Sequence, residues 1–269
     1  MFATLIKHEA RLQAKTLLGM LGVALALFAT GFVMALLRLP VFGSLGVLLA
    51  FGAGAALTFV VPLYLLWRYA QSMYGREGYL THALPVRPAT VYWAKVLWAF
   101  VVWLVVTVVT VALWLGALLA QELASGGSVG SFLAMVRANL AAMPANAVAM
   151  FVGWLLLGLF LYVVQFAWVV TFGMEERFRS FGWGGPVVVW FVAYLAVQLV
   201  LVAALFLIPL GMNYDLQFVV ESLLPKIGGL FDNQDPGFVP LGWAPILLAT
   251  LPVYIVWTLR SLRSHTSLR

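Results

Sequence analysis

Hydrophobic runs of about twenty residues recur six times along the chain, and within them polar positions do not alternate with apolar ones. An element at the surface of a water-soluble core needs a polar outer face, which produces a period of two or of 3.6 residues. A run of roughly twenty apolar residues instead has the length of a helix that crosses about 30 Å of hydrocarbon. The pattern predicts six membrane-spanning helices, over Leu17–Leu37, Ser44–Trp67, Val96–Ala120, Asn146–Thr171, Pro186–Ile208 and Leu241–Leu259.

Composition agrees with this interpretation. Hydrophobic residues make up 64% of the chain and charged residues 9%, with a mean hydropathy of +1.05, whereas soluble domains are usually about 25% charged. The absence of cysteine excludes disulfides and thiolate metal sites. The first run is too long for the core of a typical signal peptide. We therefore predict an all-α integral membrane protein, with residues 1–269 forming a single transmembrane domain.

Lysine and arginine are distributed unevenly among the predicted loops. Three cations lie on one side, at Arg38, Arg137 and Lys226, together with five acids. The opposite side holds the other twelve, namely Lys7, Arg11, Lys15, Arg68, Arg76, Arg87, Lys95, Arg177, Arg179, Arg260, Arg263 and Arg269. Because cationic loops stay on the cytoplasmic side, both termini are predicted to be cytoplasmic in a multi-pass cell-membrane protein.

Two segments outside the spans are also patterned. Lys7, Arg11 and Lys15 are four residues apart, which predicts an interfacial helix over residues 2–15; a merely solvated basic start is the alternative. The extracellular segment 210–240 mixes apolar and charged residues and is too long for a simple turn. Short helices dipping into the outer leaflet and an ordered surface loop both suit it.

Motifs for chemistry are scarce. No phosphate-binding Gly-x-x-x-x-Gly-Lys-Ser/Thr motif occurs, and His8–Glu9 lacks the second histidine of a zinc-protease helix. Residues 126–130 match Gly-x-Ser-x-Gly, but Ser128 lies in a predicted external loop, whereas the three histidines fall on the cytoplasmic side. We therefore predict a turn at Ser128, and no catalytic site, metal site or cofactor in this chain.

The predicted spans contain no Asp, Glu, Lys, Arg or His, which counts against an ion-coupled carrier. Gln165 and Gln198 are neutral polar residues that suit either a cargo pathway or interhelical hydrogen bonds. Small residues recur every fourth position at Gly46, Ala50, Gly54 and Thr58, a spacing that lets helices approach closely at a subunit interface or within the chain. Pro62 and Pro252 are candidate kinks in spans two and six.

The cytoplasmic link between spans two and three, residues 68–95, has a pattern of its own. Tyr69, Met73, Leu80 and Leu84 share one face at near-helical spacing. Pro85 ends this pattern, and Pro88 suits the first turn of the next helix. The link is predicted to be a short, bent, amphipathic coupling helix held between two spans.

The residues of this link resemble a family. Glu77-Gly78-Tyr79-Leu80 is followed by Leu84-Pro85-Val86, and Lys95 leads into span three. This run, with the six-span layout, is similar to the permease subunit of bacterial ABC-2-type ABC exporters. The resemblance implies a plasma-membrane location, a second permease subunit of the same or a homologous chain, and a separate ATPase subunit that holds ATP and Mg²⁺. It also implies that coupling to the ATPase uses Arg76, Glu77, Gly78, Tyr79, Leu80 and Pro85.

Two other classes of membrane protein fit the same pattern. A secondary carrier or a lipid scramblase would work without ATP, and charge-free spans do not count against the scramblase. A non-transporting membrane partner, such as a sensor or an assembly subunit, is the third class. A stable ATPase partner favours the exporter, whereas transport by the purified chain alone favours the carrier or scramblase.

Overall fold

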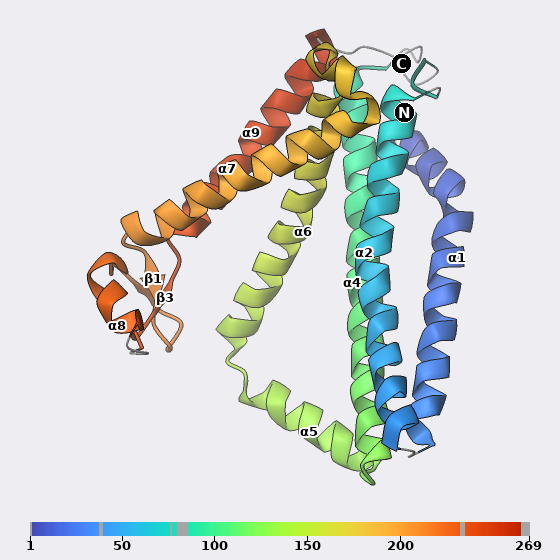
Figure 1. Ribbon diagram of the computed structural model, residues 1–269, viewed down its shortest axis with the longest axis vertical. Coiled ribbons are helices and arrows are strands. Elements are labelled where there is room, and N and C mark those ends of the chain that lie inside the picture. The colour runs from blue at the N-terminus through green and yellow to red at the C-terminus, as the bar shows by residue number, and fades with distance from the viewer. Residues whose placement is uncertain (1, 38–39, 76, 80–85, 232–234, 265–269) are drawn as a thin grey trace. The chain divides into compact units, whose positions relative to one another are not determined.

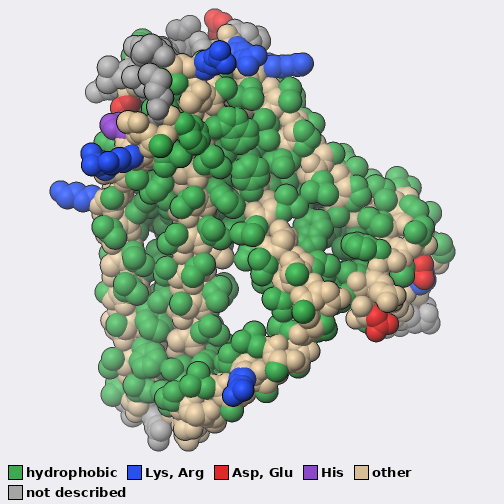
Figure 2. All heavy atoms as spheres, turned by 180° about the vertical axis from the view of Figure 1, so that it is seen from behind, with side chains coloured by type: hydrophobic (Ala, Val, Ile, Leu, Met, Phe, Trp, Pro, Cys, Tyr) green, Lys and Arg blue, Asp and Glu red, His purple; other side chains and the backbone are tan. Residues whose placement is uncertain are grey.

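The computed structural model describes residues 2–37, 40–75, 77–79, 86–231 and 235–264. Within these ranges, six helices are long and apolar enough to cross a membrane. They are α1 (Phe2–Leu36), α2 (Pro40–Tyr74), α4 (Pro88–Ala124), α6 (Ala145–Gly173), α7 (Gly185–Leu207) and α9 (Trp243–Ser264). Each coincides with one predicted span, which confirms the prediction of six long apolar helices. Figure 2 shows hydrophobic side chains over most of the visible helix surfaces.

Several helices extend well beyond the apolar runs. α1 and α2 have 35 residues each and α4 has 37, about 52–56 Å at 1.5 Å per residue. Residues 2–15 are therefore the first turns of α1 and not a separate helix. The predicted link 68–95 likewise contains the end of α2 and the start of α4, where Pro88 lies in the first turn as predicted. A helix satisfies its own backbone, so it continues past the point where hydropathy falls.

Contacts between residues divide the chain into two compact units. Unit 1 comprises Met1–Ser72 and Ala83–Val163, and unit 2 comprises Met73–His82 and Val164–Arg269. One boundary lies near the end of α2, one falls between residues 82 and 83, and one lies inside α6. The segment that joins α2 to α4 thus begins within unit 2, although both of these helices belong to unit 1.

In unit 1, α1 and α2 approach closely through small residues. A Cβ atom on Gly31 would lie 2.6 Å from the backbone nitrogen of Ala50 and from the backbone oxygen of Gly46. Ala35 and Ala50 are completely buried. Larger side chains would separate the two backbones, so these positions set the distance between the helices.

Gly54 and Thr58, the last two of the small residues spaced four apart on α2, face α4. The Thr58 and Thr110 hydroxyl groups are 3.1 Å apart, and Thr110 also donates to the Gly54 carbonyl at 3.3 Å. The Trp114 indole donates to the Phe51 carbonyl at 3.1 Å. The residues Gly46, Ala50, Gly54 and Thr58 therefore make contacts within the chain, the first two towards α1 and the last two towards α4.

A helix that the sequence analysis did not predict, α5 (Val129–Ala142), follows α4. Gly126 has φ +94°, a value that glycine adopts without strain, and it redirects the chain after α4. The Ser128 and Ser131 side chains each accept a hydrogen bond from the other residue's backbone N–H, at 3.1 and 3.0 Å. Figure 1 shows α5 leading from α4 to α6.

Unit 2 is built around aromatic rings from the end of α6 and from α9. The Trp168 ring centroid lies 4.8 Å from that of Tyr254 and 5.7 Å from that of Trp257. Phe172 stacks on Trp168 at 5.5 Å and meets Trp257 edge-on at 5.0 Å. Gly182, with φ +56°, has a non-helical conformation inside the 3₁₀ helix η1 (Glu176–Gly184) and turns the chain shortly before α7.

The segment between α7 and α9 contains a small antiparallel sheet in the order β2-β1-β3. Its strands are β1 (Gly211–Met212), β2 (Phe218–Val219) and β3 (Val239–Pro240), and the short helices η2 (Leu224–Lys226) and α8 (Ile227–Phe231) lie between β2 and β3. Short helices were one of the two sequence-based alternatives for this segment; the sheet was not foreseen. Entry of the segment into the outer leaflet stays a prediction.

Candidate functional site: a buried polar cluster beside the link

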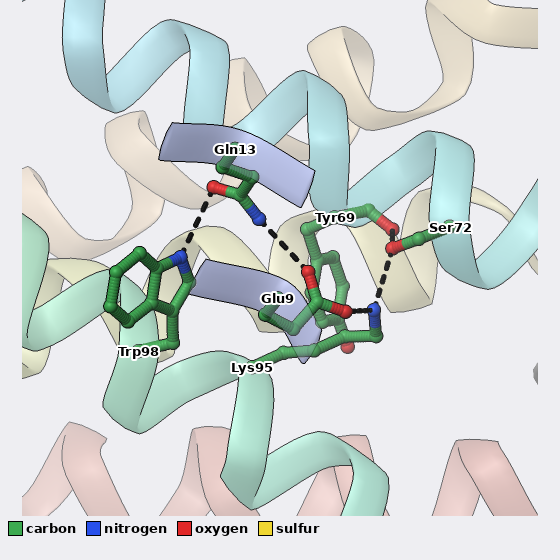
Figure 3. Close-up of polar contacts among 6 residues, drawn as sticks. All are labelled: Glu9, Gln13, Tyr69, Ser72, Lys95 and Trp98. Carbon is green, nitrogen blue, oxygen red and sulfur yellow. Dashed lines mark hydrogen bonds and ion pairs between the residues drawn. The ribbon is translucent and has the colours of Figure 1, made fainter. Parts of the chain in front are cut away.

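Polar side chains from three helices of unit 1 meet near the end of α2, and two of them, Glu9 and Lys95, are charged. Figure 3 shows Glu9 from α1 and Lys95 from α4 directed towards each other, with Ser72 of α2 beside the lysine. The exposed fraction is 8% for the Lys95 side chain and 12% for that of Glu9. We call Glu9, Gln13, Ser72, Lys95 and Trp98 the polar cluster.

Hydrogen bonds connect the whole cluster. Lys95 Nζ forms an ion pair with Glu9 Oε1 and donates to Ser72 Oγ at 2.9 Å. The Gln13 amide donates to Glu9 Oε2 at 2.9 Å, and Gln13 Oε1 accepts from the Trp98 indole at 3.2 Å. Ser72 Oγ in turn donates to the Tyr69 carbonyl at 3.1 Å.

Local helical geometry brings these groups together. Glu9 and Gln13 are four residues apart on α1, and Tyr69 and Ser72 are three residues apart at the end of α2, so each pair shares one helix face. Lys95 and Trp98, three residues apart on α4, present a cation and an indole to that face of α1. Both oxygens of the Glu9 carboxylate accept hydrogen bonds, which is the condition under which a buried ion pair is tolerated. Loss of either charged partner would leave the other buried without compensation.

Sequence reasoning did not predict this cluster. Lys95 was placed on the link, and Glu9 was considered only as part of a zinc-protease motif. The available signal was that Glu9 is the one acidic residue before Glu77, on an otherwise apolar or basic segment. Both residues lie in long helices but outside the predicted apolar runs, so their charges do not contradict the charge-free spans.

Three of the predicted coupling residues are described by the structure. Glu77 and Tyr79 are exposed, Tyr79 to 58%, whereas Gly78 is buried and donates its N–H to the Gly75 carbonyl at 2.9 Å. Tyr79 thus presents an aromatic ring on the surface of this segment. The other three predicted coupling residues, Arg76, Leu80 and Pro85, lie outside the described residues.

The two glutamines named as pathway candidates both lie in unit 2. Gln165 is partly buried on α6. Gln198 is exposed on α7, where its amide donates to the Tyr194 hydroxyl at 3.3 Å, one helical turn away. They belong to different helices, and the contacts observed for Gln198 are those of a local side-chain pair.

Ser128 has a structural role in this fold, because it caps the N-terminus of α5. Ser131 extends this cap by donating to Glu122 Oε1 at 2.8 Å. Of the three histidines, His8 lies on α1, and the other two lie outside the described residues. No group of three or more metal-ligating side chains occurs among the residues that the structure describes.

Comparison with known proteins adds no relative to this description. No family model matches the chain, and neither a curated protein nor a solved structure is significantly similar to it. The geometry defines an α-helical architecture with six helices that are long and apolar enough to cross a membrane, and with a buried polar cluster that joins α1, α2 and α4.

Proposed function

We propose that this chain is the membrane subunit of an ATP-driven exporter, moved by a separate ATPase that binds the link between α2 and α4. The observation behind the proposal is that the residues after α2 have most of their contacts with unit 2. Residues 73–82 belong to unit 2, whereas the helices that the link connects belong to unit 1. A partner that displaces this segment would act on both units through one short stretch of chain.

The side chains of the link support a protein partner. Tyr79 exposes 58% of its surface next to the exposed carboxylate of Glu77. Aromatic residues are enriched among those that carry most of the energy of protein interfaces. ATP hydrolysis then drives transport only if the nucleotide states of the ATPase differ in affinity for two conformations of this chain.

The polar cluster would transmit such a displacement within unit 1. Ser72 is the last residue of unit 1 before residues 73–82, and its hydroxyl accepts the Lys95 hydrogen bond at 2.9 Å. Lys95 is joined to Glu9 in turn. A movement of the end of α2 would therefore displace α4 through the Ser72–Lys95 hydrogen bond, and α1 through the Lys95–Glu9 ion pair.

The experiment purifies the tagged chain in mild detergent, identifies a copurifying ATPase and measures vanadate-sensitive ATP hydrolysis in the assembled complex. Tyr79→Ala and Glu77→Arg are expected to abolish the stimulation of hydrolysis by transport substrate. Glu176→Arg reverses an exposed charge on η1 and serves as the matched control.

Unchanged coupling in both link variants would contradict the assignment of the link. Transport by the purified chain in vesicles without ATP would instead support the secondary carrier or the scramblase. A complex without any ATPase, together with cargo flux that survives deletion of the chain, would support a non-transporting membrane partner.

A further inference from the structure

A groove in unit 2 has one polar and one apolar end. It has a volume of about 500 Å³ and lies between α9 and the start of η1. The α9 wall is formed by Pro252, Val253, Val256, Trp257, Arg260 and Ser261, and the opposite wall by Glu175 and Arg177. The α9 residues follow one another at helical spacing, so they form a continuous stripe.

The polar end carries two arginines. Arg177 Nε donates to Glu175 Oε2 at 2.7 Å, and its guanidinium carbon lies 4.6 Å from the centre of the Phe172 ring. These contacts hold the guanidinium in place, yet 55% of the Arg177 side chain remains exposed. Arg260 lies across the groove on α9. Because Glu175 is buried and paired, the two arginines leave this end with a net positive charge.

The other end of the groove is apolar and open. Val253 and Val256 are about half exposed, at 50% and 48%. Arg260 is seven residues from Val253, which corresponds to about 10 Å along the helix. Trp257 lies between the cation and the valines, at the position where amphipathic rings mark the boundary between headgroups and hydrocarbon. Figure 2 shows Lys and Arg side chains near the end of α9, next to an extended hydrophobic surface.

We propose that this groove is a binding site for an anionic phospholipid. The lipid phosphate would be held between Arg177 and Arg260, because planar guanidinium groups bind phosphate oxygens with two parallel hydrogen bonds. One acyl chain would lie along Val256, Val253 and Pro252. A phospholipid has an anionic head and an apolar tail. These match the two ends of the groove, where arginines and valines lie.

The test titrates the purified full chain in detergent with phosphatidylglycerol or with phosphatidylcholine, and follows binding by native mass spectrometry and thermal unfolding by tryptophan fluorescence. Phosphatidylglycerol is expected to bind more tightly and to raise the unfolding temperature more. Arg260→Gln should weaken binding of phosphatidylglycerol about tenfold, the effect of losing one hydrogen bond to a charged group. Phosphatidylcholine has the same phosphate but no net negative charge, so the preference for phosphatidylglycerol over phosphatidylcholine should become smaller.

Two further variants distinguish binding in the groove from non-specific attraction to surface cations. Arg263→Gln removes an exposed cation one turn beyond Arg260 and outside the groove, so it should retain wild-type lipid binding. Val256→Trp fills the apolar end at a half-exposed position, which the fold should tolerate, and should reduce binding with both arginines present. Arg177 is left unchanged, because its removal would leave the buried Glu175 without a partner.

The proposal is overturned if the two lipids bind equally to the wild-type chain, or if Arg263→Gln weakens binding as much as Arg260→Gln does. Wild-type affinity in Val256→Trp would show that the acyl chain does not occupy the groove. Displacement of phosphatidylglycerol by soluble glycerol 3-phosphate at equal concentration would assign the groove to a free phosphate compound and also overturn the lipid proposal.

Discussion

In unit 1, small and polar residues make the close contacts among α1, α2 and α4, whereas in unit 2 aromatic rings make the contact between α6 and α9. In unit 1, Gly31 and Gly46 bring two backbones into contact, and the Glu9–Lys95 pair connects α1 to α4. In unit 2, Trp168 and its neighbouring rings from α6 and α9 fill the contact. Inside a lipid bilayer, helix association gains little from the hydrophobic effect, so packing and hydrogen bonds decide it.

The two arrangements differ in how much each depends on single positions. A close backbone contact or a buried ion pair allows one residue type on each side, and any change removes most of the interaction. A cluster of rings spreads its contacts over many atoms, each worth only ~0.1–0.2 kcal/mol. We therefore expect substitutions to be costly at a few positions of unit 1 and better tolerated in the aromatic cluster of unit 2.

The largest effect is expected at the buried ion pair. Glu9→Gln should lower the free energy of unfolding by about 3–5 kcal/mol, because Lys95 would remain buried without a counter-charge. The same change at Glu221, whose side chain is 49% exposed in its pair with Lys226, should cost about 1 kcal/mol or less. Reversible unfolding in mixed micelles measures both values.

A double variant checks the cause of that loss. Glu9→Gln combined with Lys95→Met removes both charges and should recover most of the lost stability. Equal stability of the Glu9→Gln and Glu221→Gln variants would mean that the polar cluster does not hold the three helices together.

The next effect concerns close packing of α1 and α2. In Gly46→Ala, the new Cβ would lie 2.6 Å from the Gly31 carbonyl oxygen and 2.8 Å from the Met34 side chain, which should destabilise the chain by about 1–3 kcal/mol. Gly22→Ala is the control, since a Cβ there has nothing within 4 Å. Gly22→Ala should be neutral or stabilising, because alanine favours a helix over glycine; the opposite order would refute the close contact.

A matched pair of tryptophans compares the two units directly. Trp98 donates its indole N–H to Gln13 at 3.2 Å, so Trp98→Phe should cost about 1–2 kcal/mol by leaving the amide oxygen without this bond. Trp168 is buried, and its indole nitrogen has no hydrogen-bond partner among the described residues. Trp168→Phe keeps an apolar ring and should therefore change stability by less than about 1 kcal/mol. Equal losses in the same unfolding assay would remove the distinction between the units.

The smallest effect belongs to an exposed hydrogen bond beside the small sheet of unit 2. The Tyr214 hydroxyl donates to Asp235 at 2.5 Å. This hydrogen bond lowers the pKa of Asp235, which the Gly237 N–H lowers further, and it raises the pKa of Tyr214. The resulting stabilisation is present between about pH 4 and pH 10, the ordinary values of the two groups. It is lost as pH falls through the lowered pKa of Asp235 or rises through the raised pKa of Tyr214.

The measurement is a titration of the Tyr214 phenol by ultraviolet absorbance, taken as the difference between the wild-type chain and Tyr214→Phe. Asp235→Asn should return the pKa of Tyr214 towards its ordinary value. An unchanged titration in Asp235→Asn would show that the hydrogen bond does not form in solution.

The six long helices could be predicted from the sequence alone, because each satisfies its backbone hydrogen bonds within itself and hydropathy is a local property. The position of Pro88 in the first turn of α4 could also be predicted, because proline lacks an N–H where a helix needs none. α5 could have been found too, since Ser128 and Ser131 have the spacing of a helix cap. The two-residue strands are too short to show a periodic pattern.

Two features were decided only by tertiary structure. One is the polar cluster, and the other is which helix each of the small residues on α2 contacts. Glu9 and Lys95 are 86 positions apart, and nothing in the neighbourhood of either residue specifies the other. Gly46 and Gly54 have the same spacing pattern, yet one faces α1 and the other α4. Sequence determines which segments form helices, whereas the contact partner of each helix face depends on how complete helices pack against one another.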